Sequence, residues 1–181
     1  IAARAADWAA AAGMVVVVAA GNEGNKNWRF IATPADADSV IAVAAVDRNG
    51  QHVSFSSRGP RVDGRVKPDL AAMGAGVVAA DPSGSIVVGS GTSFASPILA
   101  GMVAGFWQAH PQLTAQQVIE ALKKSASQST IPDDRLGFGI PNFVRASEWV
   151  ARNVGGGMKL FPNPSRGEEG IQVEFPLDFD P

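Results

Sequence analysis

The chain has 181 residues, 46% of them hydrophobic and 18% charged, which is typical of a globular protein with one or two domains. Its formal net charge of −2 gives no basis for binding nucleic acid or an anionic membrane. Cysteine is absent, which excludes disulfides and thiolate zinc sites. Two histidines are too few for a His-rich metal centre, so we assign no metal ligand to the functional site.

The first 60 residues predict a helix followed by buried strands. Residues 1–12 are rich in alanine and predict a helix that Gly13 ends. The apolar, β-branched run 14–19 predicts a parallel strand covered on both faces. Residues 39–46 predict a second such strand, and residues 53–59 a short strand leading into a turn. The longest apolar stretch is too short to span a membrane, which takes about 20 residues.

The next 95 residues alternate short strands with helices. Strands are expected at residues 69–73, 76–80 and 86–88. Apolar residues at intervals of three and four predict a helix from Thr92. Further helices are expected at 114–125, with a near capping box of Thr114 and Gln117, and at 142–153. Interleaved strands and helices indicate an α/β fold with a mostly parallel sheet.

Three glycines at 155–157 break this pattern and predict a flexible linker. We therefore divide the chain into a domain at 1–153, a linker at 154–157 and a tail at 158–181. The tail alternates polar and apolar residues at 171–175, which is typical of a β-strand. The chain also begins at Ile1 in the middle of a pattern, which indicates a fragment.

Ser93 is the candidate nucleophile. It lies in the segment 91–97, GTSFASP, between a short strand and a long apolar helix. At a helix N-terminus, free backbone N–H groups and the helix dipole favour developing negative charge. The alternative is that Thr92 or Ser93 only caps the helix, as Ser and Thr commonly do.

Asn22 is the second candidate. It follows the predicted strand 14–19, and ligands of parallel sheets bind at the carboxyl ends of strands. Its side-chain amide there is suited to donating a hydrogen bond to a developing oxyanion. The alternative is an ordinary turn Asn in a loop flanked by glycines.

Taken together, the motifs resemble the subtilase family of serine proteases. Residues 17–24 (VVAAGNEG) resemble the family's oxyanion-hole segment and residues 91–97 its nucleophile segment. Further matches lie between and after them, in the family's order: SVIAV at 39–43, SFSSRGP at 54–60, KPDL at 67–70 and GFG at 137–139. Two departures, Ile98 for His and Met73 for Pro, lie outside the catalytic triad.

The resemblance implies a three-layer, subtilisin-like fold, here incomplete, with helices on both faces of the sheet. It also implies a Ser-His-Asp endopeptidase in which Ser93 attacks the peptide carbonyl and Asn22 and the Ser93 N–H hold the oxyanion. Ala19, Ala20 and Gly21 would line one wall of the pocket for the substrate side chain, with Ala32 near its base. Substrates would be peptides or proteins, and no cofactor is required for this chemistry.

Neither histidine fits the missing triad base. In subtilases Asp and His precede the Ser, but His52 begins a segment with its own family match and His110 ends a helix. We therefore expect both groups upstream of Ile1, and this chain alone to be inactive. One alternative is a catalytically inactive domain kept for binding. An α/β-hydrolase is a poorer match, because Ala95 stands where its Gly-x-Ser-x-Gly motif needs Gly.

Two further features concern export and metal binding. Residues 159–167 (KLFPNPSRG) resemble the start of the C-terminal sorting domain of type IX secretion, which implies a secreted or cell-surface protein that contacts the secretion machinery. The alternative is a Pro-rich linker. Asp36 and Asp38 offer oxygen ligands for a structural calcium ion, although paired surface carboxylates are more often only solvated.

Overall fold

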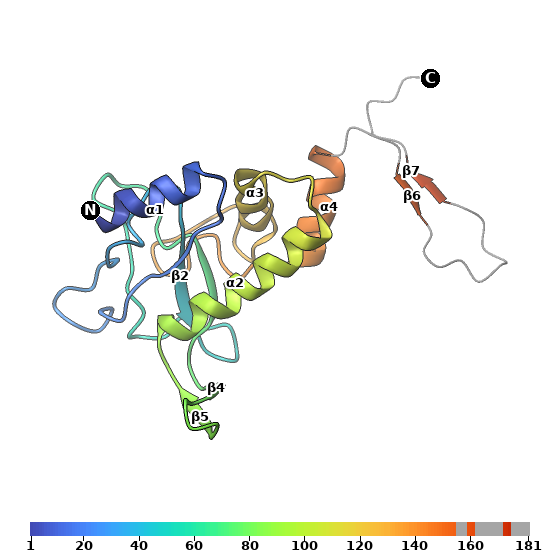
Figure 1. The fold of residues 1–181 in the computed structure, drawn as a ribbon. Helices are drawn as coiled ribbons and strands as arrows, with labels where there is room; N and C mark the ends of the chain where they lie inside the picture. The colour runs from blue at the N-terminus through green and yellow to red at the C-terminus, as the bar shows by residue number, and fades with distance from the viewer. Residues whose placement is uncertain (155–158, 162–171, 175–181) are drawn as a thin grey trace.

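The computed structural model describes residues 1–154, 159–161 and 172–174. Figure 1 shows the helices and strands in chain order. The helices are α1 (Ala2–Ala11), α2 (Thr92–Ala109), α3 (Ala115–Ser125) and α4 (Phe143–Asn153). The strands are β1 (Val17–Ala19), β2 (Ile41–Val46), β3 (Leu70–Met73), β4 (Val77–Ala80), β5 (Ile86–Gly89), β6 (Lys159–Phe161) and β7 (Gln172–Glu174).

Three parallel strands in the order β1-β2-β3 hold the centre of the fold. Val18 pairs with Ala42, and Val43 with Leu70. All six residues of β2 are buried, as their unbroken apolar run predicts. Within the described residues β1 is one of the two outer strands of this sheet, and its three residues are only half-buried. The strand predicted at 14–19 is therefore shorter and less covered than expected.

Alternate residues of β2 point to opposite faces of the sheet. Ile41, Val43 and Ala45 belong to one large core cluster. α2 crosses this face, as Figure 1 shows. It contributes Leu99, Val103 and Phe106 to the cluster, and Val118 and Leu122 come from α3. The main core thus lies between the sheet and the helices that follow the predicted nucleophile.

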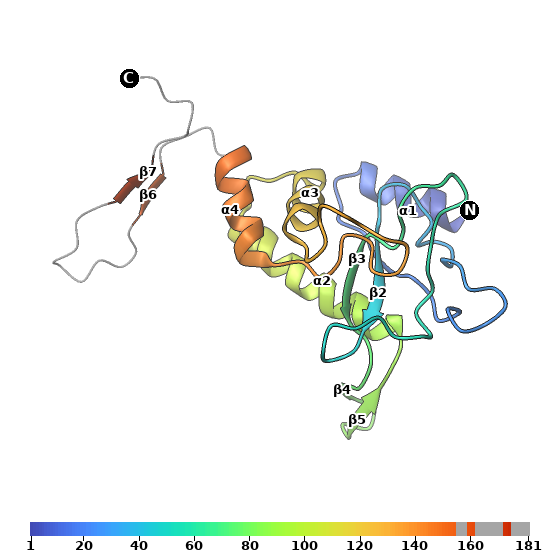
Figure 2. The ribbon, with the colours of Figure 1, turned by 180° about the vertical axis from the view of Figure 1, so that it is seen from behind.

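Segments without regular secondary structure cover the other face of β2 in the described chain, as seen from behind in Figure 2. Ala42 packs there with Ala20, Ile31 and Ala35. Ala44 and Val46 pack with Ala71, Leu136 and Ile140. The α/β fold with a parallel sheet is confirmed, and loops take the place of helices on this second face.

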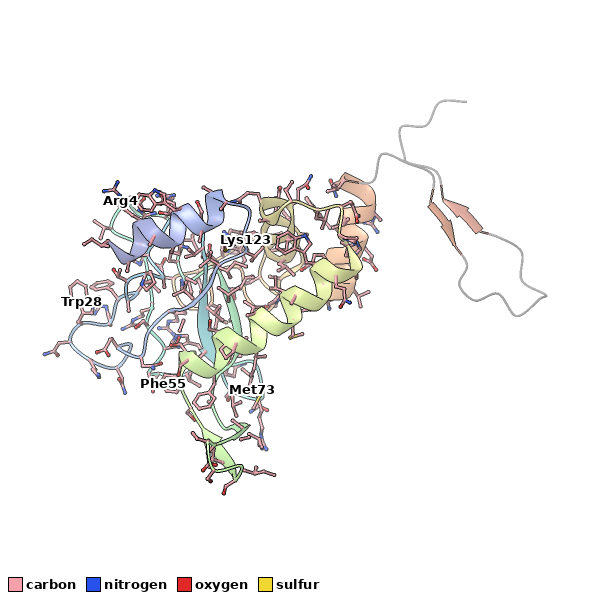
Figure 3. The ribbon with its side chains drawn as sticks, viewed as in Figure 1. Arg4, Trp28, Phe55, Met73 and Lys123 are labelled. Carbon is pink, nitrogen blue, oxygen red and sulfur yellow. The ribbon has the colours of Figure 1, made fainter. Side chains whose placement is uncertain are left out.

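The prediction of a strand at 53–59 is wrong. These residues form turns, with the N–H of Ser56 donating to the Val53 carbonyl at 3.0 Å. Phe55, labelled in Figure 3, lies in this turn. The hydroxyl of Ser56 accepts from the N–H of Ala45 on β2 at 3.0 Å, so a side chain occupies the place of a neighbouring strand. The alternation of this segment therefore does not reflect a strand, since Ser54 is exposed and Ser56 is buried against β2.

Most of the remaining helices and strands lie where the sequence predicts them. The short strands at 76–80 and 86–88 form the antiparallel pair β4-β5. Thr114 and Gln117 form a full capping box at the start of α3, and Asn142 caps α4 through its side chain. In the described part of the chain no helix is long and apolar enough to cross a membrane. The glycine linker lies outside the described residues.

Candidate active site

α2 begins at Thr92, directly after Gly91, and Ser93 is exposed in its first turn. Gly91 occupies the N-cap position, and no side chain caps the helix from there. The simple capping role for Thr92 or Ser93 is therefore not what the structure shows. The backbone N–H groups of a first helical turn have no acceptor within the helix, so the N–H of Ser93 is placed to bind a negative group.

Asn22 is anchored to the start of this helix, 70 residues away in sequence. Its Oδ1 accepts the N–H of Thr92 at 2.9 Å and the hydroxyl of Thr92 at 3.0 Å. The Thr92 hydroxyl in turn accepts the N–H of Gly21 at 3.2 Å. A backbone N–H can only donate, so the atom of Asn22 that faces Thr92 must be its oxygen. The amide nitrogen is thereby left for another acceptor.

Gly91 separates this amide nitrogen from the Ser93 hydroxyl. Its φ of 157° lies at the edge of the left-handed region. A Cβ at this position would stand 3.0 Å from Ser93 Oγ and 3.5 Å from Asn22 Nδ2. A side chain here would therefore crowd the Ser93 hydroxyl and touch the Asn22 amide at ordinary contact distance. The structure thus places a hydroxyl, an amide donor and a helix N-terminus around one glycine, a suitable arrangement for acyl transfer.

The four residues predicted to line the substrate pocket lie together. The N–H of Ala32 donates to the Ala20 carbonyl at 2.9 Å, next to Ala19 at the end of β1. Gly21 has a φ of 111°, and a Cβ there would come within 2.9 Å of the Ala32 side chain. Only small residues fit this contact. Their part in binding a substrate stays a prediction.

Thr92 is the functional residue that sequence reasoning missed. It is 1% exposed and joins the two motif segments through three hydrogen bonds. The sequence shows it only as a helix-start residue beside the serine. No spacing rule indicates a bond across 70 residues, because that bond depends on β1 and α2 meeting in the fold.

The two histidines lie away from this arrangement. His110 ends the helix that Ser93 begins, which at 1.5 Å per residue puts the two about 25 Å apart. Its Nε2 lies 2.8 Å from Ser147 Oγ. His52 lies in the turn after β2 and lines a hollow with Gly24 and Arg58. That neither histidine is the triad base stays a prediction.

Asp36 and Asp38, the candidate calcium ligands, differ in their surroundings, and Oδ1 of Asp36 is buried without a hydrogen-bond partner. Asp38 is bound by the guanidinium groups of Arg61 and Arg65, which hold the pKa of its carboxyl below the ordinary value. One oxygen of Asp36 accepts the Thr33 hydroxyl at 3.0 Å. Among the described residues no three acidic or His side chains gather to hold a metal. Calcium binding stays a prediction.

Comparison with known proteins agrees with this geometry. The family profile of the peptidase S8 subtilase family matches residues 2–139, most of the chain. This chain belongs to the subtilase family. Subtilases are serine endopeptidases, and residues 2–139 are the part of this chain that matches the family.

Named relatives and solved structures are consistent with the subtilase assignment. Serine protease AprX of Bacillus subtilis is 39% identical over 77% of this chain and 36% of its own length. Subtilisin DY of Bacillus licheniformis is 42% identical over 68% of this chain and 43% of its own length. The prenylagaramide maturation protease PagA matches with a TM-score of 0.68 and 29% identity, over 80% of this chain and 53% of that one. Sphericase matches with a TM-score of 0.65, 28% identity and coverages of 77% and 51%.

This subtilase chain thus spans about half or less of the proteins it matches. The tail at 158–181 that resembles a sorting domain falls largely at 158, 162–171 and 175–181, outside the described residues. The described pieces of the tail, β6 and β7, pair antiparallel, with Leu160 opposite Val173. The strand expected at 171–175 is therefore present in part, and the sorting function stays a prediction.

Proposed function

We propose that this chain supplies the nucleophile and the oxyanion-binding half of a serine endopeptidase active site. The hydrogen bonds of Thr92 to Asn22 carry the proposal, because they fix which end of the Asn22 amide faces Ser93. A turn Asn with no functional role would not need its amide orientation set by a residue 70 positions away.

In this mechanism Ser93 Oγ attacks the carbonyl carbon of the scissile peptide bond. A His supplied from outside this sequence accepts the hydroxyl proton and passes it to the leaving amine, and an Asp orients that His. The carbonyl oxygen becomes an oxyanion and accepts hydrogen bonds from Asn22 Nδ2 and the Ser93 N–H. The positive end of the α2 dipole adds to this stabilisation.

The substrate is a peptide or protein chain, and one wall of the pocket for its side chain is formed by Ala19, Ala20 and Gly21, with Ala32 near its base. Small residues on this wall leave room for a sizeable side chain. The protein is secreted or held at the cell surface, and the tail at 158–181 addresses it to the secretion machinery. The family supports the protease role, and the resemblance of the tail supports export.

Labelling of the full-length protein with a fluorophosphonate probe tests the nucleophile. An activated serine reacts with the probe, so the wild type should label and Ser93→Ala should not. Ser96→Ala, three residues further along α2, is the matched control and should label. A folded protein that shows no label dependent on Ser93 would contradict the proposal and favour an inactive domain used for binding.

Asn22→Ala tests the oxyanion role in a peptide-cleavage assay. Loss of one oxyanion donor lowers kcat by about 10²–10³, a range carried over from a subtilisin and not specific to this chain. KM should change much less, because the bond forms fully only in the transition state. Asn27→Ala, an exposed residue of the same loop, should retain full activity. Equal kcat values for Asn22→Ala and wild type would show that Asn22 takes no part in the mechanism.

A further inference from the structure

A second polar hollow of about 340 Å³ lies apart from Ser93, on the loop that carries Asn22. Gly24 and Asn25 form one side of it, His52 and Ser54 another, and Arg58 and Arg135 supply its charges. A water molecule takes up about 30 Å³ in the liquid, so the hollow has room for a small ligand with several waters.

Two nitrogen atoms of the residues that line this hollow are buried without a hydrogen-bond partner. They are Nε of Arg58 and Nε2 of His52. A guanidinium N–H left unpaired away from water costs more than an ordinary lost hydrogen bond, because the group is charged. Such groups in a native structure are normally satisfied by a ligand, an ion or ordered water.

The charges around the hollow are mainly positive. Arg58 and Arg135 both depress the pKa of His52, although burial of the ring is the larger cause. Asp133 is the acid whose charge opposes them. One oxygen of Asp133 already accepts the N–H groups of Arg135 and Leu136, at 2.8 and 2.7 Å. The whole chain carries a net charge of −2, so this positive field is local.

We propose that this hollow binds a small oxyanion, of the carboxylate or sulfate type, between Arg58 and Arg135. Two guanidinium groups match the planar or tetrahedral oxygens of such a group. His52 gains a proton when the anion binds, since the anion offsets the positive field that keeps the ring neutral. Asn25 lies three residues after Asn22, so the bound anion fixes the loop that holds the oxyanion donor. This inference does not depend on the proposed protease chemistry.

The chain has two histidines, and NMR titration of their rings tests the site directly. Sulfate keeps its full charge between pH 5 and 8, and sodium chloride at equal ionic strength is the reference. Sulfate should raise the pKa of His52 by about one unit, the usual effect of one nearby opposite charge. His110, bonded to Ser147 on α4, should not respond. Equal shifts of both histidines, or none, would overturn the proposal.

Arginine variants link the shift to the hollow. Arg135 is exposed, so Arg135→Gln should fold normally and abolish the sulfate effect on His52. Arg58→Gln should do the same, with folding checked by circular dichroism. Arg152→Gln on α4 removes the same charge elsewhere and should retain the full shift. A shift that persists in Arg135→Gln, or that falls equally in Arg152→Gln, would refute a site at the hollow.

A second arm identifies the source of the anion. An acetylated glutamyl peptide amide replaces sulfate, and its glutamine counterpart is the uncharged control. A response to the glutamyl peptide at lower concentration than to sulfate assigns the hollow to a carboxylate of a peptide chain. A response to sulfate alone assigns it to a free inorganic oxyanion. No response to either contradicts the proposal.

Discussion

Thr92 shows how one hydroxyl organises a site that two sequence motifs only indicate. It donates to Asn22 Oδ1 and accepts the N–H of Gly21, while its own N–H binds the same oxygen. The side chain is buried, so none of these bonds is replaced by water when it is lost. Thr92 is a positioning residue, since it acts on the proposed chemistry through Asn22.

Thr92→Val should destabilise the fold by about 1–3 kcal/mol, because the Gly21 N–H loses its partner in a buried setting. In the full-length enzyme kcat should fall while KM changes little, since Asn22 Oδ1 retains the backbone N–H of residue 92 but loses the hydroxyl, which holds the amide less firmly. Thr92→Ser retains the hydroxyl and should recover most of kcat. A kcat for Thr92→Val equal to that of wild type would show that the bonds are structural only. Urea unfolding and steady-state kinetics measure the two effects.

His52 gives a pH dependence of stability with a definite sign. Burial first, and then the charges of Arg135 and Arg58, lower its pKa in the folded protein from the ordinary value of 6.5. At a pH between the lowered pKa of folded His52 and 6.5, the unfolded chain binds more protons than the folded one. The contribution of His52 to the free energy of unfolding is therefore fully present above about pH 6.5 and is lost as the pH drops through the folded pKa.

Urea unfolding of wild type and His52→Gln at pH 7.5 and 5.0 checks this dependence. The wild type should lose more stability on acidification than His52→Gln. The carboxyl pKa values of Asp38, Asp63, Asp81 and Asp133 are lowered from 3.8, so these groups act below this window. Identical pH profiles for the two proteins would show that His52 does not destabilise the fold in acid.

α3 is a segment that the local sequence predicts correctly, and the turn at 53–56 is one that it does not. The capping box of α3 needs only Thr114 and Gln117, three residues apart, so the pattern is visible without the fold. The apolar and polar residues of the turn alternate, and this pattern wrongly predicts a strand. The Ser56 hydroxyl satisfies a backbone N–H of β2 instead, and no local pattern reveals that partner.

Thr114→Ala should destabilise the domain by about 1 kcal/mol, the usual loss for an N-cap. The N–H of Gln117 loses its acceptor, the Thr114 oxygen at 3.3 Å. Thr114→Ser retains the oxygen and should stay close to wild type. Thermal unfolding followed by circular dichroism compares the three proteins, and equal midpoints would show that the cap adds nothing to the folded state.

A buried cluster of charges links distant parts of the whole chain. Asp69, 3% exposed, accepts Lys67 Nζ at 2.5 Å and the Ala42 N–H at 2.8 Å through one oxygen. Its other oxygen binds Nζ of Lys123 on α3 at 2.6 Å (Lys123 is labelled in Figure 3). Lys67 also donates to the Val40 carbonyl. β2, β3 and α3 therefore meet at one carboxylate, and burial lowers the pKa of Lys67 while Asp69 opposes that change.

Asp69→Asn should destabilise the fold by about 3–5 kcal/mol, because it leaves the Lys67 ammonium in the interior without its counter-ion. Urea unfolding provides the measurement. Asp63→Asn removes a carboxylate paired with Arg65 at the surface and should have little effect, since exposed pairs contribute little. Comparable losses for the two variants would show that the buried cluster is not the stronger link.

The amino-acid sequence by itself determined the family, the helix starts and the buried strand β2. It also singled out Ser93 and Asn22 as the candidate nucleophile and oxyanion donor. These follow from local patterns: apolar runs, caps and ordered motifs that each occupy a few residues. Only the tertiary structure decided how Asn22 is oriented, why Gly91 must stay small and which residues enclose the positive hollow. The physical reason is that each of these depends on hydrogen bonds or contacts between segments tens of residues apart. Such contacts exist only once β1, the turn at 53–58 and α2 have been brought together.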